Sequence, residues 1–245
     1  MMMPDVLRYA ADAYLKNIKM VSFFSIPFLL AFLIPLLAPT PTYVALGATF
    51  LRTGSMYIDL TYADVAVIVV SFLLSLFLVS FAIVSINLLI KSQRTFTNIK
   101  TEVLEGIEKY TLTVFWLYLT AWVLELIVNL VGYEYGVNEL LTPLFGLLIS
   151  LPLFYAPTAI VIDEQSPFRA LWSSIQMIRS QFGYFLLWVV IGMAALSLVD
   201  VLFILVRDLV PFARYLVLVV NALVVLPFLI MLQVQIYLTK YTILK

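Results

Sequence analysis

Charged residues are absent from six long intervals of this chain, and apolar residues dominate each of them. The intervals run from Lys19 to Arg52, Asp64 to Lys91, Lys109 to Glu125, Glu139 to Asp163, Arg179 to Asp200 and Arg214 to Lys240. A helix needs about 20 apolar residues to cross a hydrocarbon layer roughly 30 Å thick. Each interval, or its extension past one acidic residue, is long enough. The pattern predicts six spans, over about 21–38, 65–90, 110–132, 140–162, 183–206 and 214–238.

Composition supports this prediction. Hydrophobic residues make up 64% of the chain and charged residues 11%, whereas soluble domains are roughly 45–50% apolar and 25% charged. Lipid must therefore be the solvent for much of the surface. We predict an all-α fold, with residues 1–245 forming a single integral membrane domain built as a six-helix bundle. The net charge of zero gives no reason to expect a nucleic-acid partner.

Basic residues are divided unequally between the two sides of the predicted membrane. Eleven lie on the side of the chain termini, and three, Arg52, Arg207 and Arg214, lie on the other. Loops rich in lysine and arginine stay in the cytoplasm. We therefore expect a protein of the cell membrane with both termini cytoplasmic, and an even number of spans agrees with that orientation.

Three segments on the predicted cytoplasmic side precede spans one, three and five. Residues 4–19, 96–110 and 166–181 place apolar side chains on one face at helical spacing, which is typical of amphipathic helices lying in the headgroup plane. With the spans, they suggest a threefold internal repeat of 4–90, 97–162 and 167–238. The alternative is that any inner loop ends with a cation before a span. We expect the outer loop at 39–61, rich in proline and glycine, to be irregular or partly helical.

Polar side chains inside the spans are the candidates for function, because buried ionisable groups usually face a bundle interior or a water-filled cavity. The set comprises Tyr118, Trp122, Glu125 and Asn129 in span three, Asp200 in span five, and Asn221 and Gln235 in span six. The four members in span three share one broad face, and the two acidic residues lie at similar depth. One interpretation is a shared ligand or ion site. The other is that both acids are hydrated or salt-bridged near the outer headgroups.

Span four contains Pro152 and Pro157 in its middle, so it should be kinked there. Broken helices mark binding sites in transporters, but proline is also common in ordinary spans. Asp163 and Glu164 follow the span. We expect them to favour the positive end of the helix beginning at Ser166.

Cysteine and histidine are both absent. Their absence excludes disulfides, thiolate nucleophiles, thiolate or imidazole metal sites and histidine general bases. The chain also lacks a phosphate-binding glycine loop, and two intramembrane carboxyls are too few for a metal-dependent hydrolase. We predict no metal site, no cofactor and no enzymatic activity.

Residues 160–174 form a specific run, Ile-Val-Ile-Asp-Glu-Gln-Ser-Pro-Phe-Arg-Ala-Leu-Trp-Ser-Ser. This run resembles a pattern found in a diffuse group of prokaryotic six-helix membrane proteins. The pattern is an apolar span end, an acid, a proline and then Ala-Leu-x-x-Ser. The group includes the membrane domain found beside glycerophosphodiester phosphodiesterases. The resemblance implies a six-span fold. The activity of that group is largely uncharacterised, so the resemblance implies no catalytic residue.

The leading hypothesis is a non-enzymatic channel, carrier or lipid-handling protein with a polar site inside the bundle. A membrane scaffold or assembly subunit, which docks partners through its interfacial helices, is the alternative. An intramembrane lipid-modifying enzyme is the third hypothesis. The expected partners are membrane lipids, a small solute or ion, and further copies of the chain packed through faces of small residues.

Overall fold

The computed structural model describes residues 3–34, 41–46, 49–54, 61–95, 99–206 and 213–241. Its described part is helical except for one two-stranded antiparallel hairpin. The elements are α1 (Met3–Lys16), α2 (Ile18–Leu33), β1 (Pro41–Leu46), β2 (Thr49–Gly54), α3 (Tyr62–Thr95), α4 (Ile99–Glu134), α5 (Asn138–Ile162), α6 (Pro167–Ser180), α7 (Phe182–Val206), α8 (Ala213–Val220), the π-helical turn η2 (Asn221–Val225), α9 (Leu226–Leu238) and the 3-10 turn η3 (Thr239–Tyr241).

Local capping sets several helix boundaries. Thr61 and Asp64 form a capping box before α3, in which the threonine hydroxyl accepts from the Asp64 N–H and the Asp64 carboxylate accepts from the Thr61 N–H. α4 ends at Glu134, and Gly136, two residues later, has a φ of +66° that suits a residue without a side chain. The Val137 N–H then returns to the Gly132 carbonyl at 2.8 Å, which is the outer bond of a Schellman motif.

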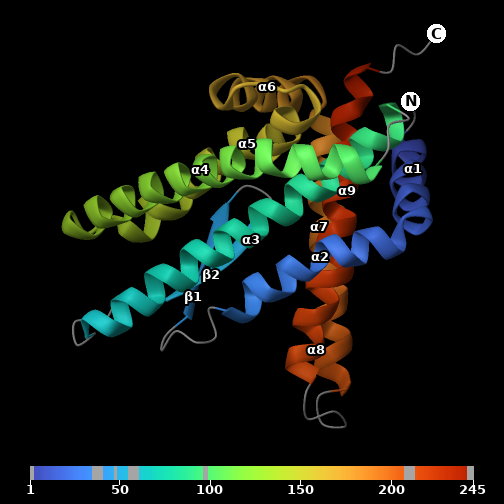
Figure 1. The fold of residues 1–245 in the computed structure, drawn as a ribbon. Helices are drawn as coiled ribbons and strands as arrows, with labels where there is room; N and C mark the ends of the chain where they lie inside the picture. The colour runs from blue at the N-terminus through green and yellow to red at the C-terminus, as the bar shows by residue number, and fades with distance from the viewer. Residues whose placement is uncertain are drawn as a thin grey trace.

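The helices form two groups that are inclined to each other in Figure 1. α2, α3, α4 and α5 run obliquely in the view, whereas α7, α8 and α9 stand upright. α3 packs against α2, α4, α5 and α9, so it joins the groups. α6 lies across the end of α5, and α1 lies beside α9 at the same end of the molecule as both chain termini (Figure 1).

Five helical segments are long and apolar enough to cross a membrane, namely Tyr62–Gln93, Val103–Glu134, Glu139–Ile162, Phe182–Leu205 and Tyr215–Tyr241. A sixth is obtained when α1 and α2, which meet at an angle of 89°, are taken as one bent span. The prediction of a helical protein with several membrane-spanning helices is therefore confirmed. The last four residues predicted for span one, 35–38, lie outside the described residues.

Two local predictions were wrong. Residues 99–110 are the start of α4, a single helix of 36 residues, rather than a separate interfacial helix. Such a helix is about 54 Å long, so it extends beyond one bilayer thickness. The outer loop contains the hairpin of β1 and β2, in which Pro41 pairs with Gly54 and Leu46 with Thr49. The threefold repeat stays a prediction, since only its first and third units have a separate short helix before the span.

The tightest packing lies toward the end of the bundle where α1 and α6 are found. Fully buried side chains concentrate in the second half of α3, the second half of α5 and in α9; examples are Ile86, Leu89, Tyr155, Ile160 and Tyr237. By contrast, only 22% of the most apolar stretch of α4 and 11% of that of α7 are buried inside the protein. These two helices therefore present most of their apolar surface outward.

Candidate functional site

A polar seam runs between the second half of α4 and the first half of α5. The Thr142 hydroxyl of α5 donates to the Asn129 amide oxygen of α4 at 3.2 Å. One turn further into the helices, Glu125 faces Gly146, and a Cβ atom added to that glycine would lie 3.2 Å from the Glu125 Oε1 atom. Gly146 thus provides the space that the carboxyl group occupies. We call Asn129, Glu125, Thr142 and Gly146 the α4/α5 seam.

Glu125 is the unusual member of this seam. Its side chain is half-buried, and its Oε2 atom is buried without a hydrogen-bond partner among the described residues. Trp122, one turn earlier, packs its ring against Phe72 of α3, with ring centroids 4.3 Å apart. Tyr118 is almost fully buried in the core. The predicted stripe of span three therefore runs from an aromatic core to the half-buried carboxyl of Glu125.

The other predicted site residues lie elsewhere. Asp200 is an exposed residue of α7, and α7 packs against α6, α8, η2 and α9, whereas α4 packs mainly against α3 and α5. Similar depth does not bring Asp200 and Glu125 together, because their helices have different neighbours. Gln235 of α9 is partly exposed. Its neighbour Gln233 is buried, and its amide donates to the Phe154 carbonyl of α5.

Asn221 begins the π-helical turn in the last span. The N–H of Leu226 bonds to the Asn221 carbonyl, five residues back. Pro227 follows; it has no N–H and its ring obstructs the regular helical register, which is a physical reason for the wider turn. The Asn221 Oδ1 atom is buried and has no hydrogen-bond partner in the described part of the chain. Turns of this kind are often found at functional sites.

Where span four was predicted to be kinked, α5 is a single helix that contains Pro152 and Pro157, and a side chain from α6 bonds to its backbone. Ser174 is fully buried, its hydroxyl donates to the Leu151 carbonyl at 3.0 Å, and it accepts from the Tyr155 N–H at 2.9 Å. In a regular helix, these two backbone groups pair directly, and the Ser174 hydroxyl contacts both of them. Pro152 lies within this turn and Pro157 follows it. The sequence singled out the prolines, but Ser174 was not recognised as a partner of this turn.

An acidic pair between α5 and α6 joins four parts of the fold. Glu164 accepts from Lys91 of α3 at 2.9 Å and from Lys109 of α4 at 2.8 Å. Hydrogen bonds from Lys109 and then Lys91 lower the pKa of Glu164 to about 2. Asp163 accepts from the Tyr237 hydroxyl at 2.6 Å and is also paired with Lys240. We call this cluster the acidic clasp.

The acidic clasp corrects one prediction. Asp163 and Glu164 were expected to favour the positive end of α6, whereas their carboxylates bind lysines and tyrosines of α3, α4, α9 and η3. The N-cap residue Ser166 has the extended conformation of a cap but makes no side-chain cap bond. Three long-range ion pairs and two tyrosine hydrogen bonds hold the two carboxylates.

Some polar residues inside the central helix α3 bond to their own backbone, whereas the Ser75 Oγ and Asn87 Oδ1 atoms are buried without a hydrogen-bond partner among the described residues. The hydroxyls of Ser80 and Ser85 and the amide of Asn87 each donate to the carbonyl four residues earlier in the same helix. These groups therefore do not direct their donors across the bundle. Within the described ranges, no group of three or more His, Cys, Asp or Glu side chains is placed to hold a metal ion.

The length and apolar character of these helices define a class, a multi-pass helical membrane protein. Comparisons with protein-family models, with curated proteins and with solved structures gave no match. The resemblance to the six-helix prokaryotic group therefore stays a prediction, and any assignment of function depends on the geometry of the site.

Proposed function

We propose that this chain is a non-enzymatic protein of the cell membrane that binds a lipid, or a lipid-soluble solute, at the α4/α5 seam. The observation that carries the proposal is Glu125, a half-buried carboxyl within a span whose buried Oε2 atom lacks a partner among the described residues. A carboxyl at such a position is costly unless it is paired. A cationic or hydrogen-bond-donating group on the ligand would supply the pairing.

Access from the bilayer fits the surroundings of the seam better than a pore through the bundle. Leu124 and Ile127, which flank Glu125 in the sequence, are 46% and 50% exposed. In α3, the donors of Ser80 and Asn87 are bonded to their own helix. The exposed neighbours of Glu125 support lipid handling over a channel.

The proposal includes an orientation. Eleven of the fourteen basic residues belong to the side of the chain termini, which supports a cytoplasmic location for both. The 89° corner between α1 and α2, with its amphipathic α1, supports a helix lying in the headgroup plane. α6 is amphipathic like α1, and it lies at the same end of the molecule as α1 (Figure 1).

Lipid retention tests the proposed site. The purified chain is incubated in mild detergent with phosphatidylethanolamine, whose ammonium group complements a carboxylate, and bound lipid is counted by native mass spectrometry. We expect Glu125→Gln to weaken retention about tenfold, the effect of one charge-assisted hydrogen bond. Glu134→Gln is the matched control, because Glu134 is an exposed acid at the end of the same helix.

The outcomes are distinct. Equal retention by the wild-type chain and Glu125→Gln would show that the carboxyl does not bind the lipid, and no retention by either would reject the proposal outright. A third variant, Asp200→Asn, tests the sequence-based pairing of the two acids. Loss equal to that of Glu125→Gln would mean that both carboxyls act on one ligand.

A second candidate function is that of a scaffold. Tyr9 and Leu15 of α1 are 55% and 63% exposed, although the helix lies at one end of the bundle beside α9 (Figure 1). A scaffold would use such a surface for association. Replacing both residues by serine would then reduce oligomerisation measured by cross-linking and leave phosphatidylethanolamine retention unchanged; unaltered cross-linking would exclude α1 as the docking surface.

A further inference from the structure

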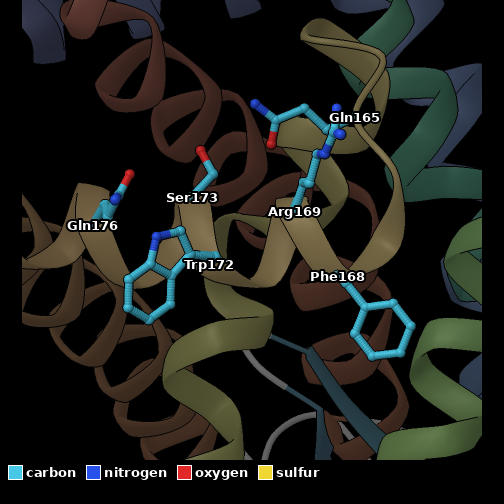
Figure 2. Close-up of a pocket in the computed structure, with 6 residues that line it drawn as sticks. All are labelled: Gln165, Phe168, Arg169, Trp172, Ser173 and Gln176. Atoms are coloured by element: carbon cyan, nitrogen blue, oxygen red, sulfur yellow. The ribbon is translucent and has the colours of Figure 1, made fainter.

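A hollow on the outward side of α6 combines one cation with several hydrogen-bond donors. It has a volume of about 430 Å³ and is lined by Gln165, Phe168, Arg169, Trp172, Ser173 and Gln176. Figure 2 shows Arg169, Ser173 and Gln176 projecting from the same side of the helix, with Gln165 next to Arg169. The Ser173 hydroxyl is already bonded to Tyr237, and one N–H of Gln165 donates to Asp163. The guanidinium group, the Gln176 amide and the second N–H of Gln165 form a donor set suited to an oxyanion such as a phosphate.

The sequence of α6 places this hollow beside an uncovered apolar surface. Ala170, Ser174, Met177 and Ile178 form the buried face of the helix, which packs against α5. Phe168 and Trp172, which also line the hollow, are 86% and 62% exposed. Aromatic side chains that contact water on one side and apolar groups on the other favour the membrane interface. A ligand with both a phosphate and an apolar part therefore matches the hollow better than a free ion.

Nearby charges leave Arg169 available for an anion. The two acids of the acidic clasp are already paired, Glu164 with Lys91 and Lys109, and Asp163 with Lys240. Among the described side chains, no ion pair within 4.0 Å uses Arg169. The region therefore carries more positive than negative charge. An approaching phosphate would meet a net attractive field.

We propose that the hollow on α6 binds the headgroup phosphate of an anionic phospholipid. Arg169 is the cation that pairs with the phosphate, Gln165 and Gln176 donate hydrogen bonds to its oxygens, and Phe168 and Trp172 contact the glycerol and upper acyl region. This site is independent of the α4/α5 seam and of the proposed function, because it recognises the opposite charge at a different place in the fold.

A fluorescence titration of the full chain in uncharged detergent tests this site. Short-chain phosphatidylglycerol is added at constant ionic strength, with phosphatidylcholine and inorganic phosphate in parallel. Trp172 lines the hollow, so binding should shift its emission, and Trp172→Phe should remove that shift. We expect Arg169→Gln to weaken phosphatidylglycerol binding about tenfold. Arg179→Gln is the matched control, because this exposed arginine of α6 does not line the hollow.

The controls separate specific binding from general attraction. Equal weakening by Arg169→Gln and Arg179→Gln would overturn the site, because it would indicate diffuse electrostatics. Inorganic phosphate that binds as tightly as phosphatidylglycerol would overturn the lipid assignment. If Arg169→Gln loses its helical circular dichroism, Gln176→Leu replaces it as the test: it removes a donor without changing charge, and undiminished binding in that variant would reject the hydrogen-bonding role.

Discussion

Replacing Ser174 by alanine removes the hydroxyl that bridges two backbone groups of α5. Without it, the Leu151 carbonyl and the Tyr155 N–H each lose a buried hydrogen-bond partner. An unpaired buried polar group costs about 1–3 kcal/mol, while interhelical hydrogen bonds in membranes average about 0.6 kcal/mol. We therefore expect the free energy of unfolding to fall by about 1–2 kcal/mol.

The measurement is an unfolding titration with dodecyl sulfate, followed by far-ultraviolet circular dichroism. Ser180→Ala is the matched control, because the Ser180 hydroxyl donates to the Met177 carbonyl of its own helix, so its loss should cost less than about 0.5 kcal/mol. Amide hydrogen exchange at Tyr155 should also be faster in Ser174→Ala. If Ser174→Ala costs no more than the control and exchange at Tyr155 is unchanged, the bridging role is refuted.

Three further predictions concern packing and charge. Gly106→Ala should destabilise the protein by about 1–3 kcal/mol in the same titration, since the new Cβ would lie 2.5 Å from Leu88; wild-type stability would mean that the leucine moves freely. Trp188→Phe should cost about 1 kcal/mol, because the indole N–H donates to the Leu229 carbonyl at 2.7 Å; an unchanged midpoint would contradict this. The pKa of Glu164 is lowered to about 2 by its lysine partners, so its contribution to stability is present above about pH 4.5 and is lost toward pH 2. The stability difference between the wild-type chain and Glu164→Gln should shrink over that window, and a constant difference would exclude this ion-pair contribution.

The helices were predictable because hydrocarbon imposes a minimum length on uncharged stretches. α5 and α7 lie within two residues of the ranges expected from charge spacing. α6 begins at Pro167, one residue after the helix start predicted at Ser166. The start of α4 was missed because an amphipathic pattern over 99–110 indicates a helix but not whether that helix bends before the span. That choice depends on packing, here on Gly106 against Leu88.

The partners of the polar residues were less predictable than the residues themselves. Pro152 and Pro157 predicted a kink, but the hydroxyl that bonds to the backbone there belongs to Ser174, which lies 19 residues from Tyr155 in another helix. Glu164 follows its span as expected, yet its partners Lys109 and Lys91 are 55 and 73 residues away. A linear pattern gives depth and face, and both can be the same for groups on helices that never touch. Only tertiary packing decides which polar groups meet.

The acidic clasp and the pairing of α1 with α9 also constrain the order of assembly. α9 leaves the ribosome after α1, α5 and α6, yet it supplies the Gln233 amide that caps the Phe154 carbonyl and the Tyr237 hydroxyl that binds Asp163. α1 also lacks one of its contacts until α9 is present, because Tyr14 packs edge-on against Phe228. The Phe154 carbonyl and the Asp163 carboxylate are therefore synthesised before their α9 partners, and they reach their final pairing only when the last helix packs.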